Sequence, residues 1–210
     1  MPELYIIAGS NGAGKSSVGS NYLPAHIRER CEIFDGDKLF MQKQKLLWQA
    51  GIRAIKEARN IAHRFVTDSF DNLVENAIVT NTHFVYEGHF INEATWDIPK
   101  RFKRSGYTIH IIFLGLANTA LSQLRVIDRA KQGGHYVQPA EVEANFYGNL
   151  EKLNKYYNLF NTVSIIDTSE PKHTILVFMN NGNIEYAVPA KQLPKWFING
   201  LPLITREIIG

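Results

Sequence analysis

The stretch Gly9-Ser10-Asn11-Gly12-Ala13-Gly14-Lys15-Ser16 decides the fold, because it fits the GxxxxGK[ST] pattern of a phosphate-binding loop. The apolar residues 4–8 before it predict a buried strand, and Lys15 to Leu23 predicts a helix that Pro24 limits. Glycines let backbone amides converge on phosphate oxygens, and the helix directs its N-terminal amides at the same anion. A merely flexible glycine loop is the alternative, but it leaves the Lys-Ser pair between strand and helix unexplained.

The Lys-Ser pair sets the expected nucleotide chemistry. Lys15 would reach the β- and γ-phosphates of a bound nucleotide, and the Ser16 hydroxyl would bind Mg²⁺. The other expected nucleotide-binding residues are the neighbouring loop positions Ser10, Asn11, Gly12, Ala13, Gly14 and Ser17. We discount GTP, because Asn154-Lys155 lacks the Asp two places on that a guanine-specifying Asn-Lys-x-Asp motif requires.

Strand and helix patterns alternate along most of the chain. Further strands are predicted at Glu32–Phe34, Thr82–Tyr86, Tyr107–Leu116 and Thr162–Ile166. Helices are predicted at Phe40–Asn76 (broken at Gly51 and at Asp68-Ser69), Glu93–Ser105, Ala117–Lys131 and Pro139–Phe160. This alternation predicts an α/β fold with a mostly parallel sheet.

The end of the chain has a different pattern. Thr174–Met179 and Ile184–Val188 flank a turn of Asn and Gly residues, which predicts a β-hairpin. We therefore expect one main domain over residues 1–170 and a hairpin and tail extension over 171–210, packed on the same domain.

Composition limits the class of protein. No apolar run approaches ~20 residues and the N-terminus lacks a basic region, so we expect no membrane span, no signal peptide, no membrane partner and a cytoplasmic location. The single cysteine, Cys31, excludes an internal disulfide. A net charge of only +3, without an evident basic patch interleaved with aromatic residues, argues against nucleic acid as a partner.

Carboxylates follow two predicted strands. Asp35 and Asp37 come after the second strand, and Glu87 and His89 follow Thr82–Tyr86. Ligands of open parallel sheets bind beyond the carboxyl ends of the strands. We expect Asp37 to act as catalytic base, and Asp35, Glu87 and His89 to bind substrate. The alternatives are a surface Asp-Gly-Asp turn, an ordinary loop glutamate and a solvated histidine.

Two arginines end a predicted helix. Arg125 and Arg129 lie four residues apart, so they share a face and could neutralise charge on a migrating phosphoryl group. The alternative is a solvated helix face with cations near the C-terminus. The following Gly133-Gly134-His135 predicts a mobile turn that would suit a lid.

Together, these motifs resemble the zeta-toxin-like P-loop kinases, and more closely their chromosomal predicted-ATPase relatives. The resemblance rests on the loop Ala8–Ser17, Phe34-Asp35-Gly36-Asp37, Glu87, and the segment Arg125-Val126 with Arg129 and Gly133-Gly134-His135-x-Val137. It covers about residues 4–170.

The resemblance implies a three-layer P-loop NTPase (kinase-like) fold with a helical lid, and binding of ATP with Mg²⁺. Toxin members phosphorylate the 3′-hydroxyl of an amino-sugar attached to UDP. Asp37 matches the catalytic base of the family, Glu87 matches a substrate-side glutamate, and Arg125 and Arg129 match the phosphate-contacting lid arginines. Lys15 completes the expected catalytic set.

The sequence departs from the family pattern at two places. A Glu-Thr-Thr-like segment is Glu87-Gly88-His89 here, and an arginine-rich helix start is Glu143-Ala144-Asn145-Phe146. The first hypothesis is therefore a kinase that acts on a hydroxyl of a small molecule, such as a nucleotide-sugar. The alternatives are a non-catalytic ATP-binding or ATPase-like interaction protein and, with less support, a nucleic-acid end kinase. An antitoxin partner is not visible in one sequence.

Overall fold

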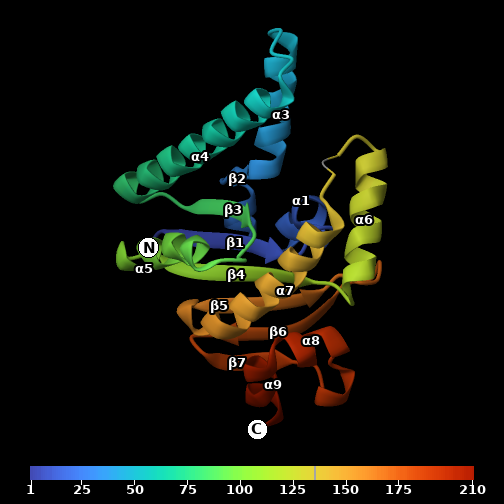
Figure 1. Ribbon diagram of the computed structural model, residues 1–210. Helices are drawn as coiled ribbons and strands as arrows, with labels where there is room; N and C mark the ends of the chain where they lie inside the picture. The colour runs from blue at the N-terminus through green and yellow to red at the C-terminus, as the bar shows by residue number, and fades with distance from the viewer. Residues whose placement is uncertain (135) are drawn as a thin grey trace.

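The computed structural model describes residues 1–134 and 136–210 and centres on one seven-stranded sheet (Figure 1). The strands lie in the order β2-β3-β1-β4-β5-β6-β7. Their bounds are Glu3–Gly9 (β1), Ile33–Phe34 (β2), Phe84–Gly88 (β3), Thr108–Gly115 (β4), Thr162–Asp167 (β5), Thr174–Asn180 (β6) and Asn183–Ala187 (β7). The first five strands are parallel, and β6 and β7 add an antiparallel hairpin beside β5. The predicted mostly parallel α/β fold is confirmed.

The helices connect the strands and cover the sheet. Their bounds are Lys15–Val18 (α1), Ala25–Arg28 (α2), Gly36–Gln49 (α3), Ile55–Thr80 (α4), Asp97–Arg104 (α5), Thr119–Lys131 (α6), Pro139–Tyr156 (α7), Lys195–Gly200 (α8) and Pro202–Ile209 (α9). Short 3₁₀ helices occupy Gly19–Tyr22, Glu93–Trp96, Tyr157–Leu159 and Ala190–Gln192. Within the described residues, no helix combines the length and the apolar content needed to cross a membrane.

The central strand β1 positions the glycine-rich loop. Residues 4–8 are all buried, because β1 pairs with β3 on one side and β4 on the other. The α-helix predicted from Lys15 ends early, at Val18, and continues as a 3₁₀ helix from Gly19. A Cβ at Gly19 would lie 2.6 Å from Ile7 Cγ2, so this segment passes closer to the strand than a larger residue would allow.

Helices α3 and α4 form a hairpin, residues 36–80, that we call the arm. Figure 1 shows the arm projecting away from the sheet, from the end of β2 to a tip between the two helices. The arm has its own small core of Phe40, Leu47 and Ala62. The predicted break at Gly51 is present, at φ 90°. The predicted break at Asp68-Ser69 is wrong: α4 is continuous there, because Asp68 faces solvent and a polar surface pair costs a helix little.

The C-terminal hairpin is present as predicted. Asn181 and Gly182 both have positive φ, 48° and 80°, as a two-residue turn with the twist of a hairpin requires. The tail that follows forms α8 and α9, and buries Trp196 and Phe197. Trp196 covers β4 closely, since a Cβ at Gly115 would lie 2.1 Å from its ring.

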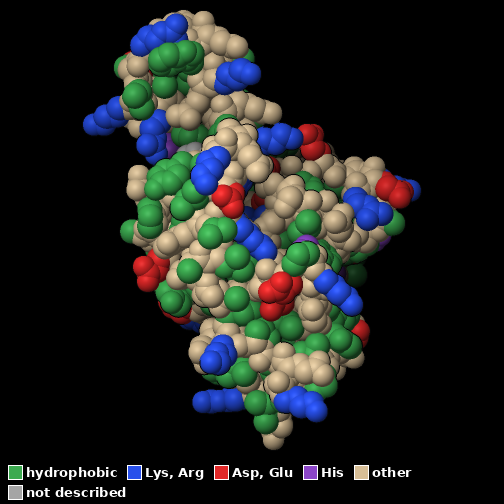
Figure 2. Space-filling view, turned by 90° about the vertical axis from the view of Figure 1, so that its right-hand side faces the viewer, with side chains coloured by type: hydrophobic (Ala, Val, Ile, Leu, Met, Phe, Trp, Pro, Cys, Tyr) green, Lys and Arg blue, Asp and Glu red, His purple; other side chains and the backbone are tan. Residues whose placement is uncertain are grey.

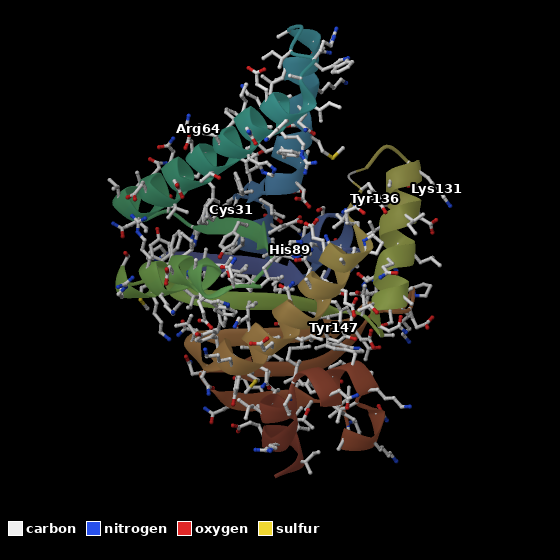
Figure 3. All side chains as sticks on the ribbon, in the orientation of Figure 1. Cys31, Arg64, His89, Lys131, Tyr136 and Tyr147 are labelled. Carbon is white, nitrogen blue, oxygen red and sulfur yellow. The ribbon has the colours of Figure 1, made fainter. Side chains whose placement is uncertain are left out.

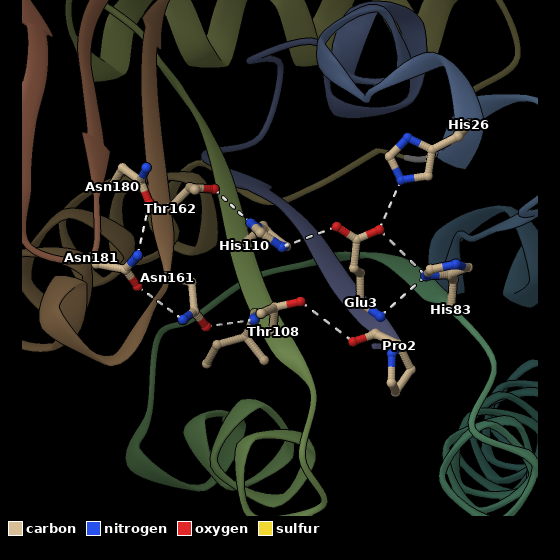
Figure 4. Close-up of polar contacts among 11 residues, drawn as sticks. Pro2, Glu3, His26, His83, Thr108, His110, Asn161, Thr162, Asn180 and Asn181 are labelled. Atoms are coloured by element: carbon tan, nitrogen blue, oxygen red, sulfur yellow. Dashed lines mark hydrogen bonds and ion pairs between the residues drawn. The ribbon is translucent and has the colours of Figure 1, made fainter.

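The amino edge of the sheet carries a polar cluster around Glu3 (Figure 4). The Glu3 carboxylate lies 2.8 Å from His26 Nε2, 3.5 Å from His83 Nδ1 and 3.6 Å from His110 Nε2. His110 Nδ1 also lies 2.7 Å from the Thr162 hydroxyl, which links β4 to β5. This cluster lies at the opposite end of β1 from the glycine-rich loop.

Candidate functional site

The glycine-rich loop lies at the carboxyl edge of the sheet, between β1 and α1. Gly12 and Gly14 have φ of 73° and 95°, a region that suits glycine. Gly12 also has no room for a side chain, because a Cβ there would lie 2.9 Å from Arg125 Cβ. Gly12 therefore requires glycine for its backbone conformation and for lack of space, and Gly14 requires it for its backbone conformation.

Two hydroxyls from later segments fix the loop backbone. Ser122 Oγ donates to the Asn11 carbonyl at 2.5 Å, and Thr168 Oγ1 donates to the Ala13 carbonyl at 2.9 Å. Ser122 belongs to α6 and Thr168 follows β5, so the start of α6 and the end of β5 both hold the loop. Neither residue is predicted from the sequence, since nothing in their local pattern indicates a contact more than 100 positions away in the chain.

Lys15 folds back onto the loop. Its ammonium donates to the carbonyls of Gly9 at 3.0 Å and Ser10 at 3.1 Å, and lies 3.3 Å from His89 Nε2. Burial lowers the pKa of Lys15 to about 8, and the nearby Glu87 carboxylate opposes this shift. The pKa of His89 is held well below its usual value by burial and by the positive charges of Lys15 and Arg129. His89 is therefore a neutral neighbour of the lysine. Figure 3 labels His89, which directly follows β3.

Ser16 and Glu87 form the second contact across the site. Ser16 Oγ donates to Glu87 Oε2 at 2.7 Å, which joins the start of α1 to the end of β3. Burial raises the pKa of Glu87 to about 7, although the bond from Ser16 favours the charged form. The two side chains place a hydroxyl and a carboxylate oxygen side by side.

This oxygen pair fits a magnesium ion that arrives with a nucleotide. Mg²⁺ prefers oxygen ligands and is held in nucleotide sites by one or two protein groups plus phosphates and water. Across the residues that the structure describes, no group of three or more His, Cys, Asp or Glu side chains could hold a metal ion. The chemistry of the pair thus suits a metal shared with a ligand rather than a metal held by the protein alone.

The two aspartates after β2 have different surroundings. Asp35 is the N-cap of α3, and its side chain accepts a hydrogen bond of 3.0 Å from the Lys38 backbone N–H. Asp37 is exposed in the first turn of α3. Both carboxylates lie close enough to Lys15 and Glu87 to influence the pKa of each. The structure thus brings both aspartates to the site, and gives Asp35 a local role in starting the helix as well.

The predicted arginines line the same edge from α6. Arg125 donates to the Ser169 carbonyl at 2.8 Å and to the Gly12 carbonyl at 3.4 Å. Arg129, one turn further along, is near enough to lower the pKa values of Lys15 and His89. Figure 2 shows a hollow below the arm, with basic and acidic side chains at its rim. The predicted lid turn Gly133-Gly134-His135 includes His135, which lies outside the described residues.

A buried chain of amide side chains links the loop to α7 and to His89. Asn145 Nδ2 donates to Asn11 Oδ1 at 2.7 Å, and Asn149 Nδ2 donates to the Asn145 carbonyl at 2.5 Å. Asn149 Nδ2 also lies 3.3 Å from His89 Nδ1, and its Oδ1 accepts from the Phe90 N–H at 2.8 Å. Asn145, which belongs to the segment where the resemblance leads us to expect an arginine, is therefore a buried contact of the loop.

The zeta toxin family profile matches residues 1–183. No curated protein matches the sequence.

Solved structures give matches at low sequence identity. One, from the characterisation of the PezAT chromosomal toxin–antitoxin system of Streptococcus pneumoniae, has 14% identity and a TM-score of 0.60, and the match covers 94% of this chain and 76% of that one. AvrRxo1-ORF1, solved with ORF2 and ATP, has 16% identity and a TM-score of 0.64 over 88% of this chain, which spans 60% of that protein's length. A kinase-like protein of Chloroflexus aurantiacus has 16% identity and a TM-score of 0.50, over 69% of this chain and 74% of that one. At these identities the structural likeness concerns the fold.

Proposed function

The chain belongs to the zeta toxin family and is a P-loop kinase, and from this premise we propose that it transfers the γ-phosphoryl group of ATP to a hydroxyl of a small substrate such as a nucleotide-sugar. The observation that supports the proposal most directly is the meeting of four segments at one edge of the sheet. Lys15, the Ser16–Glu87 pair, the two aspartates and Arg125 all lie there.

In the proposed reaction, the loop amides and Lys15 hold the phosphates of ATP, together with the other loop residues from Ser10 to Ser17. Asp37 accepts the proton of the substrate hydroxyl, whose oxygen bonds to the γ-phosphorus while the bond to the ADP oxygen breaks. Arg125 and Arg129 neutralise the charge of the migrating group. Asp35, Glu87 and His89 border the substrate.

Magnesium would be held by Ser16, with Glu87 beside it. It would neutralise phosphate charge when bound. The oxygen pair at 2.7 Å supports this assignment, because a cation between the two groups would replace their mutual hydrogen bond.

ATP turnover with and without a panel of nucleotide-sugars tests the proposal. Substrate-stimulated turnover that is lost in Lys15→Ala is the expected result. Asp37→Asn should bind ATP with unchanged affinity and lose transfer, because it keeps the size of the side chain and removes the base. Normal transfer by Asp37→Asn would refute the assignment of the base.

A specific observation favours a second candidate, a non-catalytic ATP-binding or ATPase-like interaction protein. The segment Glu143-Ala144-Asn145-Phe146 lacks the arginine that the resemblance leads us to expect there, and its Asn145 is a buried neutral amide bonded to Asn11. This function predicts ATP binding without turnover on any acceptor. An antitoxin is a partner to test in that case, since one solved relative comes from a toxin–antitoxin system.

We also propose that residues 1–170 are the kinase-like domain and 171–210 an extension on it. The pairing of β6 with β5 supports this arrangement, because it continues the same sheet.

A further inference from the structure

The positive charge of the chain is concentrated in one part of the arm, residues 38–64, whereas the whole arm (residues 36–80) has seven basic and five acidic residues and a net charge of +2. Residues 38–64 contain one acidic residue, Glu57, and seven basic ones: Lys38, Lys43, Lys45, Arg53, Lys56, Arg59 and Arg64. This segment therefore has a net charge of +6 in a chain of net charge +3, and the rest of the chain is net −3. The small net charge of the whole chain, which argued against nucleic acid, therefore conceals a strongly basic segment within the arm.

The tip of the arm, residues 45–56, adds exposed apolar side chains to that charge. Leu46 is 59% exposed, Trp48 55% and Ile55 73%, and the tip contains no acidic residue. These side chains come from the last turn of α3 and the first residue of α4, so they meet where the arm extends furthest from the sheet (Figure 1). In Figure 2 the upper projection shows basic and hydrophobic side chains together.

We propose that the tip docks on the surface of an anionic lipid bilayer. Tryptophan and aliphatic side chains enter the boundary between headgroups and acyl chains, while flanking Lys and Arg residues bind anionic headgroups. Lys45, Arg53 and Lys56 supply this flank and are all exposed. The Arg53 guanidinium lies 4.1 Å from the centre of the Trp48 ring, so charge and apolar surface are adjacent.

The exposed apolar side chains at the tip favour a lipid bilayer over other polyanionic partners. Nucleic acid interfaces are polar and strongly basic, and give exposed Leu46 and Ile55 nothing to bury against. A second copy of the arm would bring two segments of charge +6 together. The inference does not depend on the proposed phosphoryl transfer, since no tip residue belongs to the nucleotide site.

Tryptophan fluorescence provides a direct test. The chain has three tryptophans, and Trp96 and Trp196 are buried, so a change of emission on binding vesicles reports Trp48. We expect a blue shift with vesicles of phosphatidylcholine mixed with phosphatidylglycerol, and none with phosphatidylcholine alone. High salt should weaken the binding.

Two variants separate the contributions. Each cation near an anionic surface strengthens binding about fivefold, so Lys45→Gln/Lys56→Gln should bind about 30-fold more weakly in sedimentation with the mixed vesicles. The matched control Lys191→Gln/Lys195→Gln removes the same charge from exposed positions near α8 and should bind like the unmodified chain. Trp48→Ser should weaken binding at every salt concentration. ATP affinity, which none of these changes touches, verifies that each variant is folded.

The proposal is overturned if the mixed vesicles are not bound, if phosphatidylcholine binds equally, or if the control loses as much affinity as the tip variant. Salt-sensitive binding of a single-stranded RNA oligonucleotide by the arm, without vesicle binding, would overturn it in favour of nucleic acid.

Discussion

The amide chain between the glycine-rich loop and α7 makes a quantitative prediction through Asn149. This side chain is 1% exposed, and its Oδ1 accepts the backbone N–H of Phe90 at 2.8 Å. Asn149→Ala leaves that buried N–H without its partner and also removes the donor to the Asn145 carbonyl.

The expected loss follows from these two bonds. A buried donor left unpaired costs about 1–3 kcal/mol, and the bond to the Asn145 carbonyl contributes about 1 kcal/mol, so the free energy of unfolding should fall by about 2–4 kcal/mol. For a chain of this size the melting temperature should fall by roughly 5–12 °C.

Thermal unfolding without nucleotide measures this change, with Asn60→Ala as the matched control. Asn60 is exposed on α4, and within the described part of the chain its side chain makes no hydrogen bond, so its replacement should leave the melting temperature nearly unchanged. ATP affinity should also fall in Asn149→Ala, because Asn149 contacts His89, and His89 contacts Lys15. A melting temperature equal to that of the Asn60 variant would refute the reasoning, since it would mean that the Phe90 N–H does not need Asn149.

Three further predictions concern single contacts. Burial raises the pKa of Glu87 to about 7, so this side chain stabilises the fold fully below about pH 4.5, and the stabilisation is lost as the pH rises through 7. Glu87→Gln should flatten this decline of the free energy of unfolding with pH, measured by urea unfolding of the nucleotide-free chain. Burial lowers the pKa of His110, although the Glu3 carboxylate opposes this shift, so the neutral side chain stabilises the fold above about pH 6.5 and the stabilisation is lost in acid. His110→Gln should therefore make the free energy of unfolding less sensitive to acid, and an unchanged pH profile would contradict this. Gly115→Ala should lower the free energy of unfolding by about 1–3 kcal/mol, because the new methyl group would overlap the Trp196 ring, and calorimetry would detect it.

Local pattern was sufficient for the strands and the loop. The burial of β1 and the positive φ of Gly12 and Gly14 follow from short-range rules of burial and backbone conformation. The supposed break at Asp68-Ser69 was wrong, because a polar pair on the exposed side of a long helix resembles a turn in sequence alone.

The amide chain could not be obtained in this way. The bond between Asn11 and Asn145 joins residues 134 positions apart, so only the fold brings them together. A signal was present in Asn145 and Asn149, two polar residues four apart on the face of α7 that also carries Val142 and Leu150. A polar pair on a buried face indicates a partner without identifying it.

The length of α4 makes the arm a lever, so a small tilt at its anchored end moves its tip a long way. Its 26 residues span about 39 Å at 1.5 Å per residue. The far end is anchored, since Val74 and Ala77 are buried in the main core and the Tyr107 hydroxyl donates to the Ala77 carbonyl. A rigid rod of this length that tilts by about 10° around its anchored end moves its free end through roughly 7 Å. Because α3 packs against this rod and carries Asp37 in its first turn, a tilt of the arm would also move the Asp37 carboxylate.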